Sequence, residues 1–147
     1  MMPGYAVLDV ETRIRARPET IFVYFTDPIS YQRWMGARAE LDPRPGGLYR
    51  VHVSGGGIAE GKYLSLEPPH RIVFTWGWVG SKEVPPGSTT VEVTLRAEGD
   101  LTIVRLEHSG LPTEKAHDQH RLGWQHYLGR LAAVGMGEDP GPDHVDT

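Results

Sequence analysis

The sequence predicts an α+β domain in which an antiparallel sheet packs against one long helix. Two short helical stretches follow the first strand directly, where an all-β protein would have a hairpin. Polar and apolar residues then alternate over residues 46–108, interrupted repeatedly by glycine and proline. A proline-free amphipathic stretch follows over residues 114–134, which is long enough to cross a sheet.

The first strand is expected over Val7–Arg17, because apolar and charged side chains alternate along it. Pro18 ends the strand and suits the first turn of a helix, where its missing N–H is harmless. Asp27 is a candidate N-cap for a second short helix. We expect that helix to end at Gly36, since glycine favours the position after a helix C-terminus.

Five further strands are expected between the first glycine cluster and His108. Short turns join them, so they form an antiparallel meander with one polar and one apolar face. The Ser54–Gly57 segment is one such turn and Glu98–Asp100 is another. The expected strands cover residues 49–53, 58–67, 71–78, 89–96 and 101–107.

A long helix near the C-terminus is the expected cover for the apolar face. Thr113 is a good N-cap, and the helix from Glu114 to Val134 would span about 21 residues, or roughly 31 Å. Its apolar residues recur with helical spacing at Trp124, Leu128 and Leu131.

Length and composition bound the class of protein. A chain of 147 residues fits a single domain, expected over residues 1–136 with a flexible tail over 137–147. The net charge of −4 argues against nucleic acid as a partner, and the absence of cysteine excludes thiolate metal sites and cysteine nucleophiles. Neither a signal peptide nor an apolar run of about 20 residues is visible, so we expect a cytoplasmic protein without membrane insertion.

Several local sequence phrases carry a family resemblance, in the same order from about Val7 to Leu131. They are Pro18–Phe22, Tyr31–Met35, Pro45–Arg50, Gly61–Leu64, Pro68–Trp76, His108–Pro112 and His120–Trp124. With them the chain resembles the START-like (SRPBCC) superfamily, and within it the bacterial single-domain proteins similar to the C-terminal domain of the activator of heat-shock protein 90 ATPase.

This resemblance implies a helix-grip fold, also called START-like or Bet v-like. A curved antiparallel sheet would grip the C-terminal helix, with two short helices after the first strand and a cavity between sheet and helix. The superfamily includes lipid carriers, polyketide cyclases, hormone receptors and co-chaperone domains, so the fold by itself does not specify the activity.

Aromatic residues on the inner face are the main candidate site. A concave apolar surface with a few polar groups is typical of a small-ligand pocket, although the same rings could simply fill the core. We predict a soluble binding protein for a small hydrophobic or aromatic ligand, with no cofactor and no metal. Tyr49, Tyr63 or His120 would orient the ligand. The predicted ligand-binding residues are Trp34, Tyr49, Val51, Tyr63, Phe74, Trp76, Trp78, Val91, His120, Trp124 and Leu128.

Two features of the long helix bear on this site. Gly123 costs roughly 1 kcal/mol relative to alanine in a helix, which suggests the close approach of a strand or a ligand, or else a kink. His117 and His126 are expected at the surface, because the histidine spacing offers too few convergent ligands for a metal. His120 lies one turn before Trp124 and could hydrogen-bond a ligand at the mouth of the cavity.

Two alternative functions remain open from the sequence. A cyclase or hydratase acting on a polyketide-like substrate would need a buried acid–base pair, such as Glu60 with His108 or His120. A protein-interaction module would act either as a chaperone accessory or as a homodimer formed through a sheet edge.

Overall fold

The computed structural model describes residues 7–53 and 56–141. It confirms an α+β fold with two short helices after the first strand and a long helix at the end. The elements are β1 (Leu8–Ile14), α1 (Pro18–Thr26), α2 (Pro28–Gln32), β2 (Gly36–Leu41), β3 (Leu48–Val53), β4 (Ile58–Glu67), β5 (Arg71–Trp76), β6 (Thr89–Glu98), β7 (Leu101–Ser109) and α3 (Glu114–Gly135).

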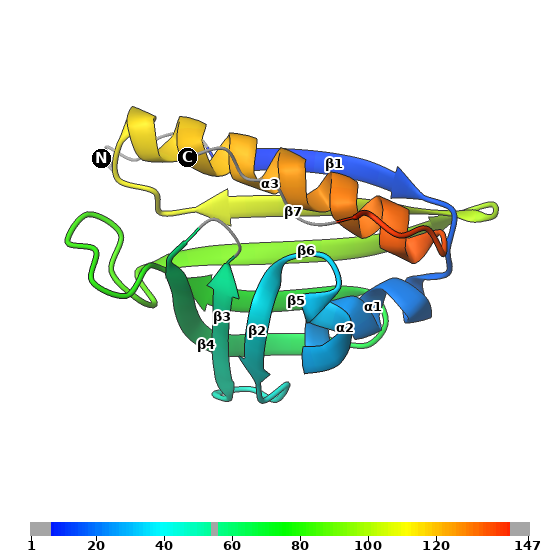
Figure 1. Ribbon diagram of the computed structural model, residues 1–147, viewed down its shortest axis with the longest axis horizontal. Coiled ribbons are helices and arrows are strands. Elements are labelled where there is room, and N and C mark those ends of the chain that lie inside the picture. Colours follow the sequence, from blue (N-terminus) through cyan, green and yellow to red (C-terminus); the bar gives the residue numbers. More distant parts are fainter. Residues whose placement is uncertain (1–6, 54–55, 142–147) are drawn as a thin grey trace.

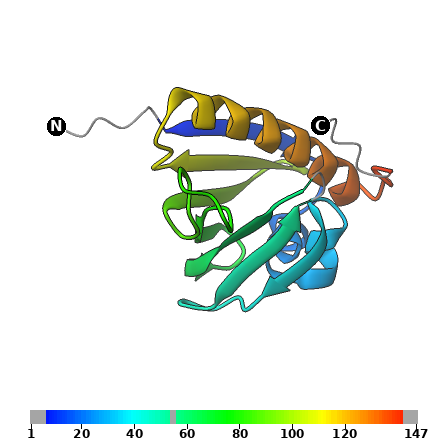
Figure 2. The same ribbon diagram turned by 60° about the vertical axis from the view of Figure 1, so that its left-hand side comes forward.

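The seven strands form one curved sheet in the order β1-β7-β6-β5-β4-β3-β2, and every neighbouring pair is antiparallel. In Figure 1, β2 and β3 run steeply across the direction of β6 and β7, because the sheet twists and coils along its width. Figure 2 shows α3 lying along β1 and β7 while the rest of the sheet curves away beneath it. The helix α2 packs against β2, and α1 contacts β6 and α3. The three helices therefore cover a single face of the sheet.

Both predicted helix caps are confirmed. The Asp27 carboxylate accepts a hydrogen bond from the backbone N–H of Ser30, at 2.9 Å. The Thr113 hydroxyl accepts one from the N–H of Ala116, at 3.0 Å. These bonds satisfy N–H groups that the first turn of each helix leaves without partners, so they fix where α2 and α3 begin.

The predicted end of the second helix at Gly36 is wrong. The helix α2 ends at Gln32, and Gly36 begins β2, a strand that the sequence pattern did not reveal. A side chain at Gly36 would place its Cβ 2.2 Å from the His52 carbonyl oxygen, so glycine is required by the close approach of β3. The strand was missed because its alanine and glycine residues have weak β-propensity and it lies at the sheet edge.

Two predicted segments fall partly outside the described residues. In the predicted turn at 54–57, residues 54 and 55 lie outside the described part. Across this segment, the backbone N–H of Val53 donates to the Gly57 carbonyl oxygen. Of the predicted flexible tail at 137–147, residues 142–147 lie outside the described part. Arg130 donates hydrogen bonds to the carbonyl oxygens of Pro140 and Gly141, so this helix residue contacts the start of the tail. Within the described part of the chain, no helix is both long and apolar enough to cross a membrane.

Candidate functional site

The aromatic residues on the inner face of the sheet form two groups with different surroundings. The first, which we call the closed cluster, has no exposed surface and consists of Phe25, Tyr31, Trp34, Tyr49, Tyr63 and Phe74. Its rings pack edge to face or stacked, with Tyr49 and Phe74 centroids 4.2 Å apart. It fills the space between the sheet and the short helices, as an ordinary hydrophobic core does.

Polar atoms in the closed cluster have partners inside the protein. The hydroxyls of Tyr31 and Tyr49 bond to each other, and the Tyr63 hydroxyl donates to the Phe25 carbonyl oxygen at 2.9 Å. The Trp34 indole N–H donates to the Tyr24 carbonyl oxygen at 2.9 Å. Burial raises the pKa of Tyr31 and of Tyr49 well above the ordinary value, so both phenols stay neutral. Tyr49 and Tyr63 therefore use their hydroxyls within the core and not toward a ligand.

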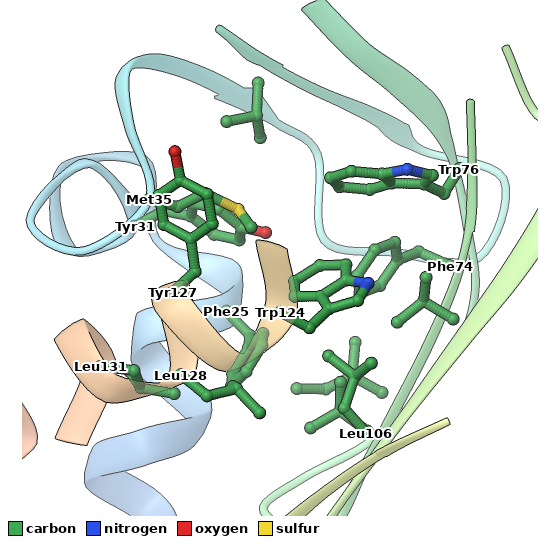
Figure 3. Packing of buried hydrophobic residues seen from close by; sticks show 14 of the residues in the cluster. Phe25, Tyr31, Met35, Phe74, Trp76, Leu106, Trp124, Tyr127, Leu128 and Leu131 are labelled. Atoms are coloured by element: carbon green, nitrogen blue, oxygen red, sulfur yellow. The ribbon is translucent and has the colours of Figure 1, made fainter. Parts of the chain in front are cut away.

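A pocket of about 190 Å³ lies beside the closed cluster, between the middle of α3 and the sheet. The helix lines it with Gln119, His120, Gly123, Trp124 and Tyr127. The opposite wall consists of Val53, Trp76, Trp78 and Met35. In Figure 3, Trp124 lies between Met35 and Tyr127 on one side and Trp76 on the other. The volume is larger than that of an engineered cavity of about 150 Å³ that binds benzene, so one or two small rings would fit.

Strand geometry explains why two tryptophans line the same wall. Trp76 ends β5, and Trp78 follows it at the same parity, so both point to the inner face. Gly77 lies between them, and a Cβ there would lie 1.7 Å from the Pro85 carbonyl oxygen. The loop after Trp78 thus packs directly on the backbone of Gly77. The backbone N–H of Trp78 donates to the Val84 carbonyl oxygen at 2.7 Å.

A chain of hydrogen bonds fixes the inner end of the pocket. The Trp124 indole N–H donates to Nδ1 of His108 at 3.0 Å, so the imidazole carries its proton on Nε2. His108 Nε2 donates to the Thr89 hydroxyl at 2.8 Å, and that hydroxyl donates to the Trp76 carbonyl oxygen at 2.7 Å. His108 therefore connects Trp124 on α3 to the backbone of Trp76 on β5.

His120 holds the outer wall in the same manner but in the opposite tautomer. The Trp78 indole N–H donates to Nε2 of His120 at 3.0 Å, and His120 Nδ1 donates to the Ala116 carbonyl oxygen at 2.7 Å. Both nitrogens are thus used inside the protein.

Electrostatically, the pocket is neutral. Burial lowers the pKa of His108 to about 3, helped by the neighbouring His120 and His117. Burial also lowers the pKa of His120, partly offset by its bond to the Ala116 carbonyl and by Glu83. Both imidazoles are uncharged at neutral pH, and the residues lining the pocket include no lysine, arginine, aspartate or glutamate.

Four of the predicted ligand-binding residues line this pocket: Trp76, Trp78, His120 and Trp124. The other seven are buried in the core and do not line it: Trp34, Tyr49, Val51, Tyr63, Phe74, Val91 and Leu128. The helical spacing from His120 to Tyr127 could have identified Tyr127, and Val53 shares the parity of Tyr49 on β3. Met35 and Gln119 carried no signal in the sequence.

Gly123 lines the pocket, and a Cβ placed there would have no heavy atom within 4 Å. Of the alternatives considered for Gly123, the close approach of a strand is therefore excluded, and the neighbouring space is open.

Glu60 does not join either histidine. It pairs with Arg50 across β3 and β4, on the face opposite to buried Val51 and Ala59. The structure therefore does not assemble an acid–base pair of Glu60 with His108 or His120, the example given for the enzyme hypothesis. His117 also differs from expectation, because its side chain is only 15% exposed, whereas His126 is exposed. Among the described residues, no cluster of three or more His, Asp or Glu could hold a metal ion.

A curved antiparallel sheet gripping a long C-terminal helix, with an aromatic pocket between them, defines a helix-grip domain of the START-like class. The profile of one family, described as activator of Hsp90 ATPase homolog 1-like protein, matches residues 15–135. The chain belongs to this family.

Solved structures of several organisms share the fold. An AHSA1-like protein from Rhizobium etli is 46% identical, with a TM-score of 0.76 over 97% of this chain and 89% of that one. CalU16 from Micromonospora echinospora is 30% identical, with a TM-score of 0.73 over 91% of this chain and 68% of that one. An HSP90 activator from Plasmodium falciparum is 23% identical and has a TM-score of 0.72, over 88% of this chain and 96% of that one. A search of curated proteins found no significant match.

Proposed function

We propose that this protein binds a small hydrophobic or aromatic molecule in the pocket between α3 and the sheet. The observation that carries the proposal is an open apolar space bordered by three tryptophans, Trp76, Trp78 and Trp124. Large aromatic side chains normally close such a space, because unfilled volume in a protein interior forfeits packing energy.

Hydrogen bonds support the persistence of this space. His108 holds Trp124 and His120 holds Trp78, so neither indole can rotate into the pocket without losing its acceptor. Breaking such a bond leaves a partly or wholly buried N–H without a partner, at a cost of about 1–3 kcal/mol. The pocket wall is therefore arranged before any ligand arrives, which reduces the entropy lost on binding.

Gly123 offers a direct test. Gly123→Leu places an isobutyl group into open space at the pocket, whereas Gly129→Leu adds the same group on the exposed side of the same helix. Each substitution removes a glycine from α3 and gains similar helix propensity, roughly 1 kcal/mol. A difference between the two variants in binding is therefore a property of the pocket.

The experiment is a titration of the ¹⁵N-labelled protein with tetralin, a neutral two-ring hydrocarbon, followed by the indole signals of the tryptophans. We expect the Trp76, Trp78 and Trp124 signals to shift in the wild type and in Gly129→Leu, and to stay fixed in Gly123→Leu. Native mass spectrometry of freshly purified protein should show a small molecule lost in Gly123→Leu alone. Equal binding by both variants, or no binding by the wild type, would contradict the proposal.

The homodimer remains a prediction beside this function. The strands β1 and β2 lie at the two ends of the sheet and each has one unpaired edge within the described residues. Light scattering across micromolar concentrations would detect a dimer formed through either edge. The chaperone-accessory role and the cytoplasmic location likewise stay predictions.

A further inference from the structure

The four tryptophans of the chain differ in what their indole N–H groups contact. Trp34 donates to the Tyr24 carbonyl oxygen, Trp78 to His120 and Trp124 to His108. The N–H of Trp76 is buried, yet it has no hydrogen-bond partner among the residues that the structure describes. Trp76 is also 2% exposed and lines the pocket.

An unpartnered donor at this position is informative because an indole N–H can only donate. Buried polar groups in native proteins nearly always have a partner, and an exception calls for a specific explanation. The ring itself is held in place by neighbours, with centroids 5.0 Å from Trp124 and 5.3 Å from Trp78. The unpartnered donor therefore belongs to a fixed ring that lines the pocket.

The other lining groups restrict the ligand further. Both nitrogens of His120 are used by Trp78 and Ala116, so this side chain has no donor or acceptor left for a ligand. The residues that line the pocket carry no charge at neutral pH, so an ionised ligand would lose its hydration without gaining a counter-charge. A volume of about 190 Å³ limits the enclosed part to one or two rings.

We propose that the ligand is a neutral one- or two-ring molecule with a carbonyl or ether oxygen on its edge, and that this oxygen accepts a hydrogen bond from Nε1 of Trp76. This inference rests on the proposed function and specifies the chemical class that the pocket selects. The rings fill the space that Trp76, Trp78 and Trp124 border, and the oxygen supplies the acceptor that the protein lacks.

The test compares two probes that differ at one atom position. Tetralin is a pure hydrocarbon, and 1-tetralone replaces one of its CH₂ groups by a carbonyl. Dissociation constants come from titrations of ¹⁵N-labelled protein at pH 7. Both probes should shift the Trp76 indole signal, and we expect its proton to lie further downfield with 1-tetralone than with tetralin, as a new hydrogen bond requires.

Substitution of Trp76 separates the hydrogen bond from general hydrophobicity. Trp76→Phe keeps an aromatic ring but removes the donor, so the preference for 1-tetralone over tetralin should fall about tenfold, the effect of one ordinary hydrogen bond. Trp34→Phe is the matched control, because its indole bonds to the Tyr24 carbonyl and does not line the pocket. That variant should keep the wild-type preference. If Trp76→Phe does not fold, the wild-type indole shift decides alone.

The outcomes distinguish the two proposals. Binding of both probes with the same shift of the Trp76 proton overturns this inference and leaves the proposed function standing. A preference that survives in Trp76→Phe overturns it as well. Binding of neither probe overturns both.

Discussion

The closed cluster and the pocket wall (Trp76, Trp78, His120 and Trp124) lie side by side on the same face of the sheet and use the same kinds of residue. In the closed cluster each hydroxyl and indole N–H has a partner, and no side chain reaches solvent. In the pocket wall Trp78 is half-buried and the Trp76 N–H has no described partner. The difference indicates that polar satisfaction, more than aromatic content, distinguishes the closed cluster from the pocket wall.

The largest expected effect breaks the closed cluster. Phe25 has no exposed surface, and its ring centroid lies 5.1 Å from that of Trp34 and 6.3 Å from that of Tyr31. Phe25→Ala should lower the free energy of unfolding by about 3–5 kcal/mol, because it removes a buried ring and leaves a cavity. Urea denaturation, monitored by circular dichroism, measures this loss of unfolding free energy.

Trp78→Ala is the counterpart in the pocket wall. Trp78 is only partly buried, so we expect a stability loss smaller than that of Phe25→Ala together with weaker tetralin binding. Equal destabilisation by the two substitutions would show that the pocket wall is core in the same sense as the closed cluster.

A second effect, of intermediate size, tests His108. Burial lowers its folded-state pKa to about 3, whereas an unfolded chain has the ordinary value of 6.5. The unfolded state therefore binds a proton first as the pH falls, so the stabilisation is complete above about pH 6.5 and is lost progressively toward pH 3. At about 1.4 kcal/mol per pH unit, the loss at pH 4.5 should be roughly 3 kcal/mol.

His108→Asn provides the control for this pH dependence. Asparagine can still accept the Trp124 N–H but does not titrate, so the slope of unfolding free energy between pH 6 and pH 4.5 should be shallower than in the wild type. Identical slopes would mean that His108 is protonated in both states, and the neutral chain from Trp124 to Trp76 would then be incorrect.

Periodicity predicted most of the fold but only part of the site. The strands and both capped helices follow from local patterns, whereas β2 depends on pairing with β3 and has no such pattern. Phe74 and Trp76 have the same parity on β5, yet one packs in the closed cluster and the other borders the pocket. Whether an inward-facing ring joins the closed cluster or borders the pocket depends on its position along the sheet, which the alternation of polar and apolar residues does not reveal. The bond between Thr89 and His108 joins two strands at a particular register, which the sequence does not specify.

The smallest expected effect concerns the hydroxyl pair in the closed cluster. Tyr49→Phe leaves the Tyr31 hydroxyl buried without its partner, so the free energy of unfolding should fall by about 1–2 kcal/mol. Replacing both residues removes donor and acceptor together. The double variant Tyr31→Phe/Tyr49→Phe should therefore lose less than the sum of the two single substitutions, and a double-mutant cycle in urea measures the difference.

Tetralin binding should be unchanged in all three variants, because neither hydroxyl borders the pocket. Additive losses would mean that each hydroxyl has another partner, such as a water molecule that enters the cluster. The two hydroxyls would then not depend on each other, and polar satisfaction by protein atoms would no longer distinguish the two regions. Strong coupling with constant tetralin affinity would instead indicate that the two hydroxyls satisfy each other and that the closed cluster is independent of the pocket.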